Sequence, residues 1–510
     1  MSRTLLKSTG VVSAMTFLSR VLGLVRDMVY AQAFGAGAGT DAFFVAFKIP
    51  NFLRRLFAEG AFSQAFVPVF SQYQSEADRR TLKALVDQVT GTLGGVLLGL
   101  TLLGVLGAPL LVWVFAPGFA DDPAKQALTT GMLRITFPYL LFISLTALAG
   151  GILNSCGRFA VPALTPVLLN ICMISAALGV APLLEVPIMA LAWGVFAAGL
   201  VQLGFQLPFL LKLGLLPRPR WGWRSPGVQQ VLRLMVPALF GSSVAQLNLL
   251  LDTLLASFLV TGSVSWLYYS DRLVEFPLGV FGVALGTVIL PSLSREHAAA
   301  SPECFSRTLD WALRWVLLIG LPATLGLAML AAPMLITLFQ YGEFSAGDVH
   351  QASRSLIAYS VGLLPFMLIK ILAPGFYARQ DTATPVRVGV IAMVANMGFN
   401  LALIVPLQHV GLALATTLSA MVNAGLLFYL LRRHGIYRPG TGWWGFGLRV
   451  AGANLAMAVA LYTIAAEPAA WLQAGLLARV QDLTLLVGLG AGVYALAGVA
   501  LGIRPRHLRL

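Results

Sequence analysis

The residues best suited to chemistry are charged side chains embedded in apolar sequence. The stretch 19–59 is otherwise hydrophobic, yet it carries Arg20, Arg26, Asp27, Asp41, Lys48, Arg54, Arg55 and Glu59. An ionised side chain at the centre of a membrane helix costs at least about 2.5 kcal/mol, so such groups usually face a bundle interior or a water-filled cavity. Because cations outnumber anions here, we expect that cavity to hold an anionic group.

Four of these residues fall on one face of a predicted helix over 41–71. Asp41, Lys48, Arg55 and Glu59 are spaced by seven, seven and four residues, which keeps them within about 40° of one another. One interpretation is an anion clamp that faces the cavity. The alternative is an internal salt-bridge ladder that joins Asp41 to Lys48 and Arg55 to Glu59 and only fixes the helix packing.

The other arginines of this stretch lie off that face. Gly23 can loosen the first helix between Arg20 and Arg26, and Pro50 can rotate the turn that carries Arg54. Each arginine can then point into the cavity. Arg20 also lies near the inner end of its helix, where its alternative is to reach toward lipid phosphates.

A comparable cation occurs in the second half of the chain. Arg272 lies between Asp271 and Glu275 in a predicted membrane helix, and it can pair with Glu275 at i+3. It can also join Arg26 and Arg54 around one anion. Arginine suits phosphate because its planar fork stays charged and donates bidentate hydrogen bonds.

Polar residues elsewhere suggest a cation site. Asp252 is alone in an apolar span, Asn396 and Asn400 share a helix face, and Thr416 and Thr417 follow in the next span. A lone carboxylate within a membrane can bind Na⁺ or H⁺, and oxygen ligands suit a hard cation, so a cation site at these residues is one interpretation. Hydrogen bonding between helices is the other.

These residues must be positioned by membrane helices. The 510 residues are 58% hydrophobic and 11% charged, with a mean hydropathy of +0.83, which predicts an all-α polytopic membrane protein. The net charge of +14 suits anionic phospholipids better than nucleic acid. We expect 14 transmembrane helices, at 10–34, 41–71, 84–116, 127–153, 160–182, 187–211, 229–259, 264–294, 308–334, 350–377, 384–405, 410–431, 444–466 and 481–503.

The charge of the loops orients these spans. With the N-terminus inside, the inner segments carry 22 Lys and Arg residues and the outer loops carry only Lys125 and Arg479. The positive-inside rule therefore places both termini in the cytoplasm. We interpret the first apolar run as a retained helix, because Arg20 and Arg26 interrupt it and no convincing cleavage site follows.

A weak internal repeat divides the chain. Pro68 and Pro291 lie 223 residues apart in matching contexts, and so do Pro162 and Pro385. Two parallel six-helix lobes around a central cationic cavity follow from this offset. The predicted division is an N-terminal lobe, a basic and aromatic cytoplasmic linker, a C-terminal lobe, and two further helices, over 1–215, 216–228, 229–433 and 434–510.

The sequence offers no enzyme signature. It contains no HExxH, GxSxG or P-loop motif, and its three cysteines have neither metal-ligand spacing nor a disulfide framework. We therefore expect a transporter that needs no cofactor.

Several long motifs resemble one known family. SRVLGLVRD (19–27), FGAGAGTDAFFVAFKIPNFLRRLFAEGAFSQAFVP (34–68), YYSDRLVEFPLGVFGVALGTVILPSLS (268–294) and APGFYARQDTATP (373–385) are similar to the MurJ (MviN) family of bacterial lipid II flippases. That family belongs to the multidrug/oligosaccharidyl-lipid/polysaccharide exporter superfamily. The resemblance implies two six-helix lobes, and it implies that the last two helices form a groove for the lipid tail.

The resemblance also implies a cargo and its binding residues. The cargo is an undecaprenyl pyrophosphate that carries the disaccharide-pentapeptide unit of peptidoglycan, moved from the inner to the outer leaflet of the bacterial inner membrane. The essential arginines fall on Arg20, Arg26, Arg54 and Arg272, supported by Asp41 and Glu59. The family match thus favours Arg54 where the helix face favours Arg55. A sodium site of some family members falls on Asp252, Asn396, Asn400 and Thr416 or Thr417, with Asn400 in place of an aspartate, which implies coupling to Na⁺ or H⁺.

Two other functions remain open at this stage. A drug or ion antiporter of the same superfamily would prefer an acidic cavity, whereas these residues are net basic. A scaffold for cell-wall synthesis proteins would not need arginines within the membrane, so their replacement should leave it working.

Overall fold

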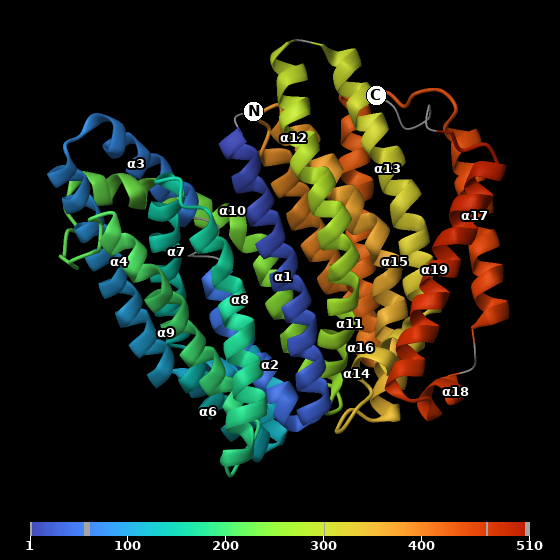
Figure 1. Cartoon of the computed structure of the whole chain (residues 1–510), viewed down its shortest axis with the longest axis horizontal. Coiled ribbons are helices and arrows are strands. Elements are labelled where there is room, and N and C mark those ends of the chain that lie inside the picture. Colours follow the sequence, from blue (N-terminus) through green and yellow to red (C-terminus); the bar gives the residue numbers. More distant parts are fainter. Residues whose placement is uncertain (1–2, 56–61, 300, 466–467, 505–510) are drawn as a thin grey trace. The chain divides into compact units, whose positions relative to one another are not determined.

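The computed structural model describes residues 3–55, 62–299, 301–465 and 468–504, whose regular secondary structure is all helical, with no strand among these residues (Figure 1). This confirms the all-α class. Close packing divides the chain into two units, Met1–Val264 and Ser265–Leu510. Among the described residues, nine helices are long and apolar enough to cross a membrane. The count of 14 spans stays a prediction.

The first unit begins with two helices that carry most of the candidate residues. The turn around Gly35 separates them, and its φ of 63° is one that glycine adopts without strain. The helices of the unit are α1 (Arg3–Phe34), α2 (Ala38–Arg54), α3 (Phe62–Glu76), α4 (Arg79–Leu106), α5 (Ala108–Phe115), α6 (Pro123–Thr136), α7 (Tyr139–Ser155), α8 (Ala160–Ser175), α9 (Met189–Lys212) and α10 (Pro226–Ala256).

Side chains of α3, α4 and α7 form a hydrophobic core at one end of this unit. Phe66 and Phe70 of α3 are fully buried there against residues such as Val86 and Ile152. Asp78 accepts a hydrogen bond from the Thr81 backbone N–H (3.1 Å) and caps α4. Hydrogen bonds from Thr81 hold the pKa of the Asp78 carboxyl below its usual value.

The helix α10 packs on the first unit, against α3, α4, α2 and α5. The sequence repeat instead groups it with the C-terminal lobe. Packing and repeat are different criteria, so the predicted lobes and their boundaries stay a prediction.

The second unit contains the remaining helices. Its last two long helices, α17 and α19, lie side by side (Figure 1). The helices are α11 (Ser263–Pro277), which begins at the end of the first unit, α12 (Val283–Ala298), α13 (Pro302–Met329), α14 (Ala331–Phe339), α15 (Ala346–Tyr377), α16 (Ala383–Arg433), α17 (Trp443–Ile464), α18 (Pro468–Gln473) and α19 (Leu476–Ala500).

The helix α16 covers the predicted spans 384–405 and 410–431. Gln408 has φ 51° and ψ −130°, which breaks the helix into two arms. An added Cβ at Gly411 would overlap the backbone of Leu403. Glycine is therefore required where the two arms approach each other.

Helix starts in the two halves follow the predicted repeat. The pairs α4 and α13, α6 and α15, and α8 and α16 each begin 223 residues apart, at Arg79 and Pro302, Pro123 and Ala346, and Ala160 and Ala383. The same offset appeared in the proline pairs of the sequence. A common helix plan therefore underlies both halves of the chain.

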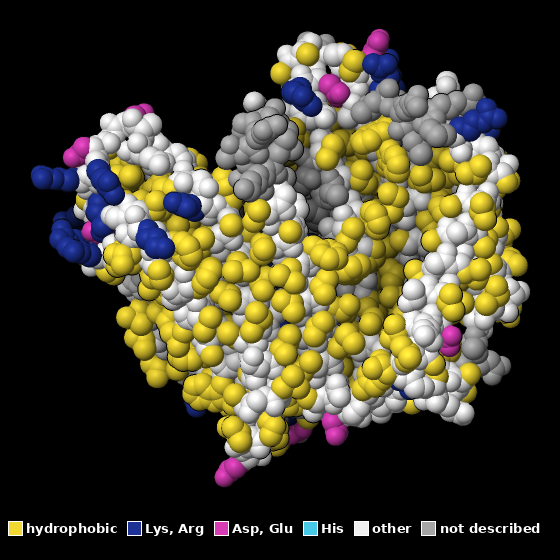
Figure 2. All heavy atoms as spheres, in the orientation of Figure 1, with side chains coloured by type: hydrophobic (Ala, Val, Ile, Leu, Met, Phe, Trp, Pro, Cys, Tyr) yellow, Lys and Arg dark blue, Asp and Glu magenta, His cyan; other side chains and the backbone are white. Residues whose placement is uncertain are grey.

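Exposed basic side chains of the first unit gather at one end. On the face shown in Figure 2, Lys and Arg cluster near α3 and α4, hydrophobic side chains cover most of the surface below them, and acidic side chains appear at the opposite end. Exposed basic residues at this end are Arg79, Arg80, Lys212, Arg218, Arg220 and Arg224. All of them lie in segments predicted to be cytoplasmic, and this distribution is the one expected of a multi-pass membrane protein.

Candidate functional site

Arg26 is buried in α1 and bonded to its neighbours. The residue is only 6% exposed. Nη2 lies 2.7 Å from Asp27 Oδ1, and Nη1 donates to Asn170 Oδ1 on α8 at 3.1 Å. Asn170 in turn donates to the Ser19 carbonyl at 2.9 Å. The guanidinium is therefore compensated by a carboxylate, and its amide partner links α1 to α8.

A second buried ion pair lies in the first turn of α2. Asp41 Oδ2 accepts hydrogen bonds from Lys125 Nζ (2.9 Å) and from the backbone N–H of Gly262 (2.8 Å). Lys125 is also buried, and its Nζ lies 4.2 Å from the centre of the Phe119 ring. Burying both charges is tolerable because each compensates the other. Asp41 thus joins three segments of the first unit.

Lys125 and Arg479, which the sequence analysis assigned to outer loops, both lie within helices, and their side of the membrane stays a prediction. Lys125 lies in the first turn of α6, and Arg479 lies in the first turn of α19. Both side chains are buried, and oxygen atoms of the protein accept hydrogen bonds from their charged groups. Each joins segments that are distant in the sequence, Lys125 through Asp41 and Arg479 through the Gln340 carbonyl.

Lys48 connects α2 to α10. Its Nζ donates to Thr253 Oγ1 at 2.7 Å. Thr253 follows Asp252, which is half-buried on the same helix. The stripe on α2 therefore contacts α6 through Asp41 and α10 through Lys48. Asp41 also forms an ion pair with Lys125, a partner that neither interpretation of the stripe included.

The arginines at the end of α2 are half-buried. Arg54 donates from Nε to Asn51 Oδ1 at 2.9 Å, one turn earlier. Arg55 follows directly, where the helix geometry changes. Glu59 lies outside the described residues. The choice between Arg54 and Arg55 stays open. Arg20 is half-buried on α1.

Arg272 lies on α11 and is more accessible than Arg26. Nη1 bonds to Glu275 Oε2 at 2.7 Å, so the pairing expected at i+3 is present. The side chains of this pair are 32% and 43% exposed. The guanidinium carbon also lies 5.3 Å from the centre of the Tyr268 ring. About one-third of the Arg272 side chain is therefore accessible to an anion while the ion pair is formed.

The candidate cation ligands of the second unit lie on α16. Asn396 and Asn400 are both fully buried, and Thr416 Oγ1 donates to the Leu412 carbonyl at 3.0 Å. Asp252 belongs to the first unit. Within the described residues, no three His, Cys, Asp or Glu side chains are placed to hold a metal ion. The sodium site stays a prediction.

Comparison with known proteins decides the family. Residues 30–480 match the family described as Lipid II flippase MurJ. A probable lipid II flippase MurJ of Vibrio cholerae is 53% identical over 515 aligned positions, covering 100% of this chain and 98% of the relative. The chain belongs to the MurJ family. A lipid II flippase MurJ of Burkholderia cenocepacia is 47% identical, covering 88% of this chain and 87% of that protein.

Solved structures agree with this assignment. A lipid II flippase MurJ in an inward closed conformation matches with a TM-score of 0.82 at 26% identity, over 98% of this chain and 99% of that one. An inward-facing multidrug resistance MATE transporter of the MOP superfamily matches with a TM-score of 0.66 at 16% identity, over 82% of this chain and 95% of that one. The second match shows the fold alone.

Sequence reasoning missed the partners that fix the buried charges in this MurJ family member. Lys125, Asn170 and Thr253 lie 84, 144 and 205 residues from the residues that they contact. No local spacing could reveal such pairs. The one available signal was that Lys125 was almost alone among basic residues on the predicted outer side.

Proposed function

We propose that this protein moves lipid II from the inner to the outer leaflet of the bacterial cytoplasmic membrane by alternating access. The observation that carries this proposal is its similarity, over essentially the whole chain, to proteins named lipid II flippases. It acts as a transporter and not as an enzyme. The charged residues of α1, α2 and α11 support the proposal, because a pyrophosphate headgroup needs cations within the membrane.

The proposed binding residues for the pyrophosphate are Arg20, Arg26, Arg54 and Arg272. Arginine is suited to this task because it donates bidentate hydrogen bonds to phosphate oxygens. The partial exposure of Arg272 and Arg54 supports direct contact with the cargo. Arg26 is compensated by Asp27, so the cargo would have to compete with that carboxylate. Asp41, Lys48, Arg55 and Glu59 have supporting roles.

The proposed source of energy is the membrane potential, with Na⁺ or H⁺ as coupling ions. Moving one elementary charge across the membrane is worth about 2.3 kcal/mol per 100 mV. The empty cationic site would be drawn back to the inner side, where the next anionic headgroup is loaded. Transport that continued unchanged after collapse of both the potential and the ion gradients would contradict this scheme.

The proposed orientation has both termini in the cytoplasm, with anionic phospholipids around the basic inner segments. Proteins of cell-wall synthesis are the expected partners, because they supply the cargo and consume it. Nucleic acid is not a proposed partner, because the basic residues are distributed over many short segments.

Complementation tests the proposed function. Cells depleted of their own lipid II flippase receive this chain as the wild type or with Arg26→Ala, Arg54→Ala or Arg272→Ala. We expect the wild type to restore growth and each variant to fail at equal membrane levels. The control is Arg295→Ala, which removes an exposed arginine of α12 outside the proposed site.

The outcomes separate the candidate functions. If the wild type fails to restore growth, lipid II is not the cargo. If the wild type and all three variants restore growth equally, these arginines only support packing, and a scaffold without transport becomes the better explanation.

A further inference from the structure

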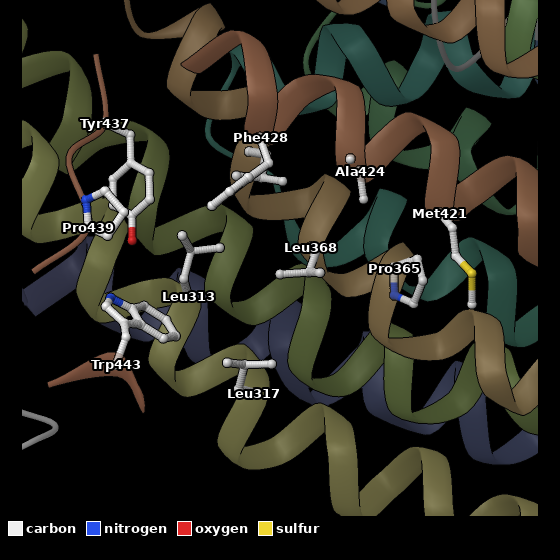
Figure 3. Close-up of a pocket in the computed structure, with 12 residues that line it drawn as sticks. Leu313, Leu317, Pro365, Leu368, Met421, Ala424, Phe428, Tyr437, Pro439 and Trp443 are labelled. Atoms are coloured by element: carbon white, nitrogen blue, oxygen red, sulfur yellow. The ribbon is translucent and has the colours of Figure 1, made fainter. Parts of the chain in front are cut away.

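The second unit contains an apolar cavity that includes none of the proposed pyrophosphate-binding residues. Its volume is about 550 Å³, which lies within the range of roughly 300–1,000 Å³ typical of ligand sites. Helices α13, α15 and α16 form its walls, and the connector 434–442 with the start of α17 closes one end (Figure 3). Leu313, Pro365, Leu368, Ala424 and Phe428 are among the lining residues.

The cavity is elongated along the helices. Tyr437 and Trp443 lie at one end and Met421 at the other (Figure 3). The lining residues of α16 extend from Met421 to Phe428, which at 1.5 Å per residue is about 10 Å. Met421 and Gly425 are exposed, so the cavity opens on the outer surface of α16. That surface belongs to a candidate membrane span.

The polar atoms at the end of the cavity are already occupied. Asp310 Oδ1 accepts hydrogen bonds from the Tyr437 hydroxyl (2.8 Å), the Gly440 N–H (3.0 Å) and Trp443 Nε1 (2.6 Å). Arg314 Nε donates to the other oxygen of Asp310 at 2.9 Å. Burial and the hydrogen bond to Asp310 raise the pKa of Tyr437, so its hydroxyl stays a donor. The rings of Tyr437 and Trp443 therefore present only apolar surface to the cavity, and this surface favours binding of a hydrocarbon chain.

Basic residues lie close in the chain to the residues that line this end of the cavity. Arg432 and Arg433 end α16, and Arg438 lies between two lining residues of the connector. All three arginines are exposed. A phosphate placed here would be attracted to them, while a chain attached to it could enter the cavity. This combination of an apolar slot with a cationic rim matches an anionic phospholipid.

We propose that this cavity binds one acyl chain of an anionic phospholipid, whose phosphate is held by Arg432, Arg433 and Arg438. The lipid stays bound to the second unit, where its acyl chain contacts α13, α15, α16 and the connector 434–442. The much longer undecaprenyl chain does not suit a slot of this volume, and hydrogen bonds to Asp310 fix the end of the slot.

Photolabelling of the full-length protein tests this site. The probe is phosphatidylglycerol with a diazirine in the middle of one acyl chain, added to the purified protein in phosphatidylcholine nanodiscs. Labelled residues are mapped by mass spectrometry. We expect labels to concentrate in 421–428 and 437–443. Labels spread evenly over the membrane helices would overturn the proposal.

A matched pair of variants on α16 tests the cavity itself. An added Cβ meets nothing within 4 Å at Gly425 or at Gly389, so both positions accept a side chain. Gly425→Phe fills the cavity and should reduce labelling at least about tenfold, because the acyl chain loses the burial of several methylene groups. Gly389→Phe lies outside the cavity and should not change labelling. Equal labelling of both variants would overturn the proposal.

The headgroup and the kind of chain are tested separately. The same diazirine chain on phosphatidylcholine should label the site several-fold less, and Arg432→Gln/Arg433→Gln should remove this difference. Equal labelling by the two lipids in the wild type would overturn the role of the arginines. Displacement of the probe by an equal concentration of undecaprenyl phosphate would overturn the choice of a phospholipid.

Discussion

Arg26 and Arg272 have different surroundings, although the sequence predicts the same ligand for both. Arg26 is buried beside Asp27 and Asn170. Removing one member of such a buried group leaves the others uncompensated, which usually costs several kcal/mol. Arg272 is about one-third exposed beside Glu275, and pairs of this kind contribute only about 0–1 kcal/mol. Replacing Arg272 should therefore affect function with little effect on stability.

The buried pair of Asp41 and Lys125 gives a prediction about stability. Lys125→Met should lower the free energy of unfolding by about 3–5 kcal/mol, because the buried Asp41 carboxylate loses its ion pair with the Lys125 ammonium. Unfolding of the purified protein in detergent measures this loss. Lys212→Met, at an exposed lysine of α9, should change stability by less than about 0.5 kcal/mol.

A double variant distinguishes the ion pair from simple loss of packing. Asp41→Asn/Lys125→Met removes both charges, so it should recover more than half of the lost stability. If the double variant is as unstable as the sum of the two single variants, the charges of Asp41 and Lys125 do not compensate each other.

The sequence predicted residue pairs only where they are local. Arg272 and Glu275 are three residues apart on one helix, so the pitch of the helix determines their contact. Lys125 and Asp41 meet only because α6 packs on α2, and nothing in the spacing of either helix determines that packing. The identity of the charged positions was therefore predictable, whereas their partners were not.

At the scale of elements, the linker after α9 lies against α4. Asp87 accepts a hydrogen bond from the Arg218 N–H (2.7 Å), and Thr92 Oγ1 accepts one from the Gly222 N–H (3.0 Å). An added Cβ at Gly91 would overlap the backbone of Arg220. The sequence identified this linker as basic and aromatic, but it gave no indication of this attachment.

The contact between Gly91 and the linker predicts how the linker responds to a larger residue. Gly91→Val should displace segment 216–225 from α4 and speed tryptic cleavage after Arg220 and Arg224 at least about tenfold, since cleavage follows local opening. Limited proteolysis of the purified protein measures this rate. Gly99→Val is the control on the same helix, because an added Cβ there meets nothing within 4 Å. Equal cleavage of both variants would contradict the attachment.

Arg479 joins the appended helices to the rest of the second unit. It donates to the carbonyls of Trp471 (3.0 Å), Leu472 (2.9 Å) and Gln340 (3.1 Å). These carbonyls lie at the ends of α18 and α14, where helices leave acceptors without helical partners. One buried guanidinium therefore satisfies two helix ends.

Loss of this guanidinium should loosen the appended helices locally. Arg479→Met should increase hydrogen exchange in 468–480 by roughly tenfold or more, because hydrogen bonds to a charged group contribute about 1.5–3 kcal/mol each. Arg295→Met, at an exposed position of α12, should not change exchange in this segment. Exchange in 468–480 that stays at the wild-type rate would show that other contacts hold α18.

At the scale of the whole molecule, the sequence predicted the all-α class, and the two-lobe repeat stays a prediction. Apolar runs and an offset of 223 residues were visible in composition and spacing, and the helix starts follow the same offset. The grouping by packing was not predictable, because α10 contacts the first unit through surfaces that no repeat specifies. The predicted topology also depends on the whole chain, because it compares the 22 Lys and Arg residues of the predicted inner segments with the two of the predicted outer loops.

That charge distribution predicts the topology. Fusion of alkaline phosphatase, which is active only outside the cytoplasm, after residue 510 should give no activity, and fusion after Phe344 should give activity. The two fusions act as controls for each other when their membrane levels match. Activity at the C-terminal fusion would contradict the predicted cytoplasmic C-terminus, and with it either the count of 14 spans or the cytoplasmic N-terminus.

The most direct test of the central claim is the amount of lipid II in the outer leaflet. Cells depleted of their own flippase would carry either the wild type or Arg272→Ala, and a membrane-impermeant enzyme that cleaves the lipid II pyrophosphate would be added from outside. We predict cleavage of lipid II with the wild type, and a loss of at least about tenfold with Arg272→Ala at matched stability and membrane level. Equal cleavage in both strains would show that Arg272 does not bind the cargo, and no cleavage with the wild type would contradict lipid II transport by this protein.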